Sequence, residues 1–403
     1  NILRHKEVFS MSIMPEGLLT EARALQPQLL ADRRQLHAHP EVGPDLPQTR
    51  EYVARRLREM GYDPRPLAGG LTADITGRDT GRCVLLRADM DALPVPELTD
   101  VEFKSQSENV MHACGHDVHT AVLLGAAKAL CGVRRQIHGT VKFFFQPAEE
   151  TGRGAREMIA AGELDEKDPP ACIAALHVFP GIPAGTLGVR RGAFNASSDS
   201  FSLNVIGRQG HGAYPELCID PIAVGAQVIT ALQQLVSREV APQDSAVVTI
   251  GTIHGGVRSN IIAPDVKMTG TIRTVRSRVR EHLFEAIPRV ARLTAEALRA
   301  CAGVEIREGT PVLVNDDGMF DRLVSVAERV VGKDRIVAFE NCSMGGEDFA
   351  FFTERVPGVM FRLGVGFKDK DNAPLHSSCF KVDESAFIYG VAALAGLALD
   401  VCR

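Results

Sequence analysis

The sequence predicts an α/β protein with a mostly parallel, covered sheet, into which a smaller α+β unit is inserted. Short apolar strands alternate with helical patterns along residues 16–196, and they do so again along residues 305–403. This alternation is typical of parallel sheets covered by helices. Residues 197–304 change to the order strand, helix, two strands and helix, which is typical of a compact α+β unit inserted into a larger domain.

In the first α/β part, apolar residues recur at helical spacing over residues 16–37 and again over 47–60, where Gly61 ends the pattern. The elements expected after these two helices are strands 71–76 and 83–89, helix 120–130, strand 140–146, helix 155–161 and strand 172–177. Polar side chains at the ends of these strands would meet at one edge of a parallel sheet.

The same periodicities predict the elements of the inserted part and of the last part. The expected elements of the insertion are strand 199–207, helix 221–240, strands 246–253 and 265–274, and helix 278–301. The α/β pattern resumes after about Val304, and its expected elements are strand 335–339, helix 348–353, strand 359–364 and a closing helix 384–399.

Composition and charge exclude several classes of function. The chain has 403 residues, 45% of them hydrophobic and 24% charged, which is ordinary for a folded globular protein. The net charge is −5 with no basic stripe, so we expect neither nucleic acid nor an anionic membrane as a main partner. The longest apolar runs are shorter than a membrane-spanning helix requires.

The N-terminal residues and the cysteines bear on the compartment. The first fifteen residues do not resemble a signal peptide, and Met11 or Met14 is a candidate start residue. The nine cysteines form neither a CxxC pair nor a regular framework. Both observations predict a reduced, cytoplasmic protein.

The densest chemical signal is the stretch His112-Ala-Cys-Gly-His-Asp-Val-His119. Histidine and thiolate are the ligands that zinc-like ions prefer, and Cys114 and His116 are spaced to present them together. A polar loop whose histidines satisfy one another is the alternative, but the density of the cluster before a helix favours a metal site. Asp117 and His119 suit a supporting role behind the ligands, and the role of His112 stays open.

Six further motifs carry candidate side chains. Glu149 and Glu150 follow the apolar strand 140–146, so one carboxylate can bind a metal while the other acts as a general base. His177 ends another apolar strand, and His376 follows a third. In the insertion, His211 lies in a glycine-rich turn, while Arg258 and Asn260 follow two glycines and suit a carboxylate or an oxyanion. The acids of 344–349 fit simple helix capping equally well.

Taken together, these motifs resemble the N-acyl-amino-acid amidohydrolases. This is the aminoacylase branch of two-metal metallopeptidases, which includes hippurate hydrolases and plant auxin-conjugate hydrolases. The matching stretches are residues 36–43, 87–94, 112–120, 146–150, 176–178, 210–215, 270–274, 344–349 and 375–377. They extend over nearly the whole chain, and several are long and rare.

The resemblance implies a zinc-peptidase-like catalytic domain with an inserted lid domain that mediates dimerisation in many relatives. It implies that the metal ligands are Cys114, His116, Glu150, His177 and His376. It also implies that Glu149 is the catalytic base and that Asp89 takes the place of a histidine found in related carboxypeptidases. His211 matches a lid histidine that stabilises the transition state, often across a dimer interface, and Asn260 matches a lid residue that assists with substrate.

The expected cofactors are two divalent ions per subunit, about 3.5–4 Å apart, with manganese, zinc, cobalt and nickel all compatible with the donor set. The expected reaction is hydrolysis of the amide bond of an N-acyl or N-aroyl amino acid, with a homodimer or a higher homo-oligomer as the expected assembly. A dipeptidase or carboxypeptidase using the same chemistry is the first alternative. A non-catalytic binding protein is the second, although it would have no use for Glu149 as a base.

Overall fold

The computed structural model describes residues 15–79, 81–162, 164 and 169–403, and it forms two compact units. The larger unit comprises the described residues up to Arg191 together with 315–339 and 352–403, and the smaller unit comprises 192–314 and 340–351. The domain limits 16–196, 197–304 and 305–403 remain predictions. The candidate start residues Met11 and Met14, and the expectation on a signal peptide, lie outside the described residues.

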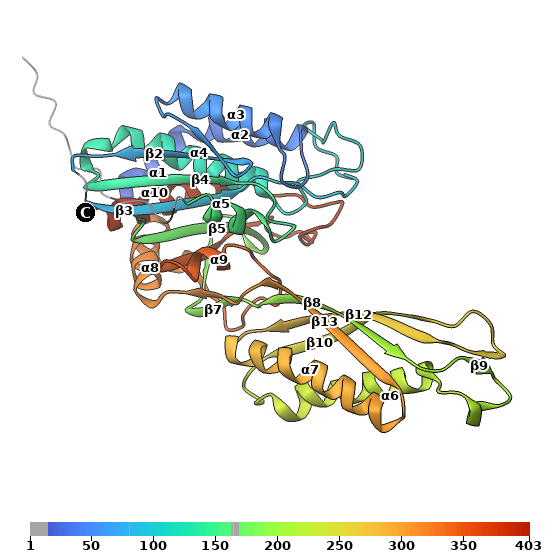
Figure 1. Ribbon diagram of the computed structural model, residues 1–403. Coiled ribbons are helices and arrows are strands. Elements are labelled where there is room, and N and C mark those ends of the chain that lie inside the picture. Colours follow the sequence, from blue (N-terminus) through green and yellow to red (C-terminus); the bar gives the residue numbers. More distant parts are fainter. Residues whose placement is uncertain (1–14, 80, 163, 165–168) are drawn as a thin grey trace, which may run out of the picture. The chain divides into compact units, whose positions relative to one another are not determined.

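The larger unit is built on one eight-stranded sheet (Figure 1), in the order β1-β2-β4-β3-β5-β16-β6-β15. Its strands are β1 (Arg65–Leu67), β2 (Gly70–Thr76), β3 (Arg82–Asp89), β4 (Gly139–Gln146), β5 (Cys172–Pro183), β6 (Leu187–Val189), β15 (Ile336–Ala338) and β16 (Gly358–Gly366). The four central strands are parallel, as predicted.

The parallel register brings the ends of the central strands together. Asp89 of β3 pairs with Gln146 of β4, so both strands end at the same level of the sheet. His177 of β5 pairs with Arg362 of β16. The polar residues that follow β3 and β4 therefore leave the sheet on the same edge, where ligand sites form in open α/β sheets.

Apolar side chains explain how this sheet is covered. Phe143, Phe144 and Phe145 are fully buried, because alternate residues of β4 face opposite sides of a sheet that is covered on both. The helices of the larger unit are α1 (Pro15–Ala24), α2 (Gln26–Ala38), α3 (Pro47–Glu59), α4 (His116–Gly132), α5 (Gly154–Ala160), α8 (Asp317–Val331), α9 (Ala350–Thr353, partly in the smaller unit) and α10 (Phe387–Val401).

Helix α10 is the most apolar of these. The stretch Glu384–Val401 is long and apolar enough to cross a membrane by length and composition alone, but 72% of it is buried inside the protein. Its residues belong to the same hydrophobic core as α4 and β3. Packing in that core accounts for its composition.

The smaller unit has a four-stranded antiparallel sheet in the order β10-β12-β8-β13. Its main elements are β8 (Ser198–Ile206), α6 (Pro221–Gln234), β10 (Ala246–Gly255), β12 (Asp265–Thr274), α7 (Ser277–Ala297) and β13 (Cys301–Thr310), and its short strands are β7 (Gly192–Asn195), β9 (Gly210–His211), β11 (Ile261–Ile262) and β14 (Leu313–Asn315). Residues of α6 and α7 share a core with the sheet.

Two sequence-based expectations were wrong in detail. The helix expected over 16–37 is two helices, because Pro27 in the first turn of α2 lacks the N–H that would continue α1. The helix expected to reach Cys301 ends at Ala297, and Cys301 begins the fourth strand of the smaller sheet. Ala302, Val304 and Ile306 alternate with polar residues and pack on that core, which is the period of a strand.

Candidate metal centre

The turn before α4 presents the first two predicted ligands. Cys114 and His116 are buried, and Gly115 between them has a φ of +86°, a left-handed conformation that glycine adopts readily. A Cβ on Gly115 would lie 2.4 Å from Cγ2 of Val178. Glycine is therefore required here both for the turn and for the close approach of β5.

His116 and His119 lie on one face of α4, because residues three apart on a helix are neighbours. Their ring centroids are 5.3 Å apart. The helix begins at His116, four residues before the predicted start at Thr120. Asp117, the next residue along the helix, consequently points to another side.

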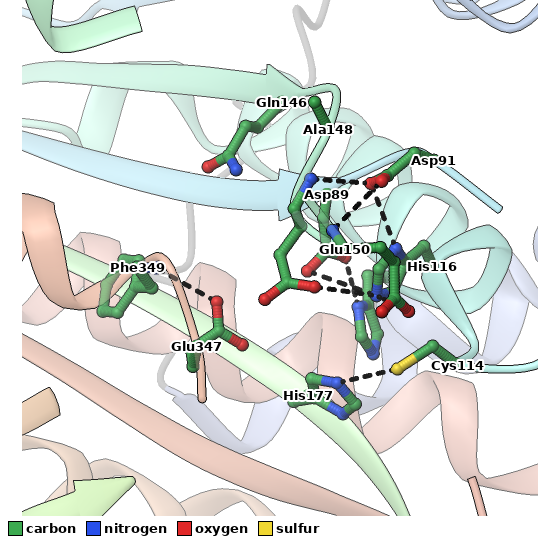
Figure 2. Close-up of polar contacts among 12 residues, drawn as sticks. Asp89, Asp91, Cys114, His116, Gln146, Ala148, Glu150, His177, Glu347 and Phe349 are labelled. Carbon is green, nitrogen blue, oxygen red and sulfur yellow. Dashed lines mark hydrogen bonds and ion pairs between the residues drawn. The ribbon is translucent and has the colours of Figure 1, made fainter. Parts of the chain in front are cut away.

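The Glu149–Glu150 pair is held by Asp91, as Figure 2 shows. The backbone N–H groups of Glu149 and Glu150 donate to the two carboxylate oxygens of Asp91, at 3.0 and 3.1 Å. Ala148, just before them, has a φ of +57°, an uncommon conformation for a residue with a Cβ. The turn after β4 is thus fixed in a strained conformation that aims two carboxylates at the edge of the sheet.

The same Asp91 also faces a ligand imidazole. Its Oδ1 atom lies 3.4 Å from Nδ1 of His116, so the carboxylate favours a proton on Nδ1 and leaves Nε2 for a metal. Asp91 was not assigned a role from the sequence. The available signal was its place two residues beyond Asp89 at the end of a buried strand.

His177 is oriented by its own backbone. Its Nδ1–H donates to the carbonyl of Val178 at 2.8 Å, which leaves Nε2 facing Sγ of Cys114 at 3.5 Å. Two ligands of one zinc-like ion, at roughly 2.0 and 2.3 Å from it in tetrahedral geometry, are separated by about 3.5 Å. The observed separation matches that value.

Asp89 and His119 form a hydrogen-bonded support for this side of the centre. His119 Nδ1 donates to Oδ1 of Asp89, and its Nε2 accepts the backbone N–H of Val178 at 2.8 Å. Both ring nitrogens of His119 are therefore engaged. Oδ2 of Asp89 accepts from Arg87 at 2.7 Å.

His376 closes the open side of the centre. Its Nε2 atom lies 3.5 Å from Oε1 of Glu150, and its side chain is 55% exposed. Its φ is +66°, and its backbone N–H donates to the carbonyl of Ala113 at 2.8 Å. This hydrogen bond holds the loop that carries His376 beside Cys114, although the two lie far apart in the sequence.

The described residues form several groups of potential ligand atoms, and two of these groups share one thiol. Cys114, His116 and His177 have ligand atoms within 4.8 Å of one another, and so do Cys114, Glu150 and His376. Nε2 of His116 and Oε1 of Glu150 are buried without a hydrogen bond to any described residue. Buried polar atoms without partners are costly, so this donor set fits two divalent ions that share Cys114.

Burial and charge set the protonation of the metal-free centre. Burial raises the pKa of the Cys114 thiol and lowers the pKa of His177 well below its ordinary value. Burial would also lower the pKa of His116, but Asp89 raises it well above its ordinary value. A bound cation is therefore what would deprotonate Cys114.

Two members of the 112–119 cluster lie away from these groups. Asp117 is predicted to support a ligand, and its Oδ2 accepts from Arg33 at 2.8 Å and from His37 at 2.7 Å. It lies in the first turn of a helix rather than in the predicted loop, and its supporting role stays a prediction. His112 is buried, and neither ring nitrogen has a hydrogen bond within the described part of the chain.

His211 and Asn260 lie in the smaller unit, where a short ribbon brings them together. β9 and β11 pair with Ile261 opposite His211, and the N–H of Gly212 donates to the carbonyl of Asn260 at 2.9 Å. His211 is exposed. Its Nδ1 accepts the N–H of Ala213 at 3.1 Å, which leaves Nε2 for a ligand.

Comparisons with known proteins agree with this geometry. The pattern of peptidase family M20/M25/M40 matches residues 85–400. The chain is 37% identical to an N-acetyl-L-cysteine deacetylase of Bacillus subtilis, covering 94% of the chain and 89% of that protein. It is 36% identical to a thermostable carboxypeptidase of Saccharolobus solfataricus, covering 95% and 98%.

A solved structure extends the likeness to the fold. The Bacillus subtilis YXEP protein, described as a dinuclear metal-binding peptidase of the M20 family, has a TM-score of 0.82 and 33% identity, covering 94% of this chain and 99% of that one. The chain therefore belongs to peptidase family M20/M25/M40 and is a metal-dependent hydrolase. The predicted α/β fold class and the predicted family are confirmed.

Proposed function

We propose that the protein hydrolyses the amide bond of N-acyl or N-aroyl amino acids, releasing a carboxylic acid and a free amino acid. The observation that carries the proposal is the pair of adjacent carboxylates at the edge of the sheet. Oε1 of Glu150 lies 3.5 Å from Nε2 of His376, whereas Oε2 of Glu149 lies 4.0 Å from Nε2 of His116. Both carboxylates belong to a donor group with His116, and Glu150 belongs in addition to the group with Cys114 and His376. We therefore assign Glu150 to the metal ions and Glu149 to proton transfer.

The proposed ligands are Cys114, His116, Glu150, His177 and His376, with Asp89 and His119 supporting them. Two bound divalent ions would polarise the scissile carbonyl and acidify a water. Glu149 accepts a proton from the attacking water and donates it to the departing amine nitrogen. His211 and Asn260 contact the substrate carbonyl or carboxylate as hydrogen-bond donors.

A dipeptidase or carboxypeptidase is the alternative, and the similarity to a protein named as a carboxypeptidase favours it. The two functions differ in whether the substrate carries a free α-amine. In the smaller unit, the carboxylate of Asp220 caps α6 by accepting from Ile222 and Ala223.

A substrate panel tests the proposal. The metal-free protein is loaded separately with manganese, zinc, cobalt or nickel and is assayed on N-acetyl, N-benzoyl and indole-acetyl amino acids and on dipeptides. We expect kcat/KM to be at least about tenfold higher for an acyl conjugate than for the dipeptide with the same C-terminal residue. The opposite order would identify a dipeptidase, and inactivity on every amide would exclude both.

We also propose that the protein is a cytoplasmic homodimer. The nine cysteines form no disulfide with one another, which suits a reducing compartment. Most of the exposed large apolar side chains belong to the smaller unit, among them Tyr214, Leu217 and Val257, and exposed apolar surface often marks an interface. Sedimentation equilibrium distinguishes a dimer from a monomer.

A further inference from the structure

His37 joins two buried carboxylates in the larger unit. Its Nδ1 lies 2.7 Å from Oδ2 of Asp117, and its Nε2 lies 3.1 Å from Oε1 of Glu97. All three side chains are at most 2% exposed. Ionised carboxylates only accept hydrogen bonds, so an imidazolium, which donates from both ring nitrogens, satisfies both of them. Nη2 of Arg33 also lies 3.3 Å from Nδ1 of His37.

The charges around His37 balance when it is protonated. Arg33 also donates to Asp117, from Nε at 2.8 Å. The buried group then holds two cations, Arg33 and His37, and two anions, Asp117 and Glu97. Burial and Arg33 lower the pKa of His37, but the two carboxylates outweigh them and raise it above its ordinary value. Buried charges are tolerated when they are paired in this way.

The two carboxylates belong to the two segments that carry metal ligands. Asp117 follows the ligand His116 in the first turn of α4. Glu97 organises the long irregular segment 90–115, which contains Cys114. Its Oε2 accepts the N–H of Ser105 at 2.7 Å, and its Oε1 accepts from Thr99. Irregular segments of this length in a compact domain are usually functional.

A second contact ties the same segment to α2. Arg33 and Arg34 lie over the ring of Phe103, with Cζ atoms 4.6 and 4.9 Å from its centroid. The His37 ring packs edge-on against Phe103, with centroids 5.6 Å apart. Helix α2 thus holds the segment 90–115 through one ion pair and one aromatic ring.

We propose that His37 is a positioning residue of the metal centre. By joining Glu97 to Asp117, it fixes the segment 90–115 against the start of α4 and thereby holds Cys114 and His116 at a spacing that ligates a metal. The inference rests on the ligand set proposed above. It predicts that the affinity for metal depends on a residue that touches no ligand.

The test compares metal affinity with global stability. His37→Gln and Glu97→Gln are prepared metal-free, and their affinities for Zn²⁺ and Mn²⁺ are measured by competition with a chelator, well below the unfolding temperature. We expect each to weaken binding by about tenfold to a hundredfold, the range typical of residues behind metal ligands. The double variant should bind no more weakly than the single variants, because both remove the same link.

Tyr52→Phe is the matched control. The Tyr52 hydroxyl donates to Asp32 at 2.7 Å, an interaction between α3 and α2 that does not involve the segment 90–115. We expect it to lower the unfolding temperature while leaving metal affinity within about twofold. The inference is wrong if Glu97→Gln binds metal with unchanged affinity. This variant decides the question if His37→Gln does not fold. An equal loss of affinity in Tyr52→Phe would also overturn the inference.

A separate measurement distinguishes this inference from the ligand assignment. If Cys114→Ser loses metal while His37→Gln and Glu97→Gln do not, the ligand set stands and only the role of His37 is wrong. If Cys114→Ser retains both ions at full affinity, the ligand set itself is wrong.

Discussion

At the scale of single residues, the ligand types follow from chemistry, but their orientation follows from partners that are distant in sequence. The sequence predicts cysteine, histidine and glutamate ligands in or after strand-end motifs, and the structure brings these side chains together. Asp91, which faces both His116 and the N–H groups of Glu149 and Glu150, was not predicted. Its contacts depend on the register between β3 and β4, and neighbouring residues in the chain contain no information about that register.

Glu149→Gln should abolish hydrolysis while both ions stay bound. The amide keeps the shape of the side chain but cannot accept a proton from water. Turnover should fall by at least about a hundredfold, with metal content measured by elemental analysis as the control. Substantial turnover in the variant would remove Glu149 from the role of base.

Metal binding should become tighter as pH rises. Burial raises the pKa of Cys114, and Asp89 raises that of His116, so both groups carry protons at neutral pH in the metal-free protein. Binding displaces these protons, so affinity increases with pH until both groups are deprotonated. Proton release measured in weak buffer should fall by about one per subunit in Cys114→Ser, and metal occupancy should fall with it.

At the scale of elements, periodicity identified the central strands and most helices, and it failed where two patterns compete. Residues 298–310 were assigned partly to a helix because the preceding pattern is strongly helical, although Ala302, Val304 and Ile306 alternate as a strand. The sequence predicts that α4 begins at Thr120, because the pattern of His116 to His119 favours a loop. Only a helix beginning at His116 places Asp117 beside His37.

Gly115→Ala should damage the metal centre more than the helix. A methyl group at φ +86° would contact Val178 at 2.4 Å, and such strain lowers the free energy of unfolding by about 1–3 kcal/mol. We expect metal affinity to fall as well. Gly132→Ala at the other end of α4 is the control, since a methyl group there would have no neighbouring atom within 4 Å. Equal effects of the two substitutions would contradict this account.

At the scale of the whole molecule, the resemblance of dispersed motifs predicted the family, and the comparison with known proteins confirms it. The exact extent of each unit could not be predicted. The chain passes through the larger unit over residues 315–339, and residues 340–351 then return to the smaller unit. No local pattern marks such a return, because it is decided by contacts between segments far apart in the chain.

His211→Ala should lower kcat strongly while leaving metal content unchanged, because His211 lies in the smaller unit and the donor groups lie in the larger one. If His211 acts across a dimer interface, mixing this variant with Glu149→Gln restores part of the activity. Each mixed dimer would then contain one intact combination. A mixture that stays inactive despite verified subunit exchange would place the action within one chain.

The shared thiol has a consequence for how the protein is made. Cys114, His116 and His177 all precede the inserted unit, whereas the second group is completed only by His376, close to the end of the chain. The residues of the first group therefore leave the ribosome long before His376, which completes the second group. Metal loading should follow this order, so that a chain with a single ion is a normal stage of its synthesis.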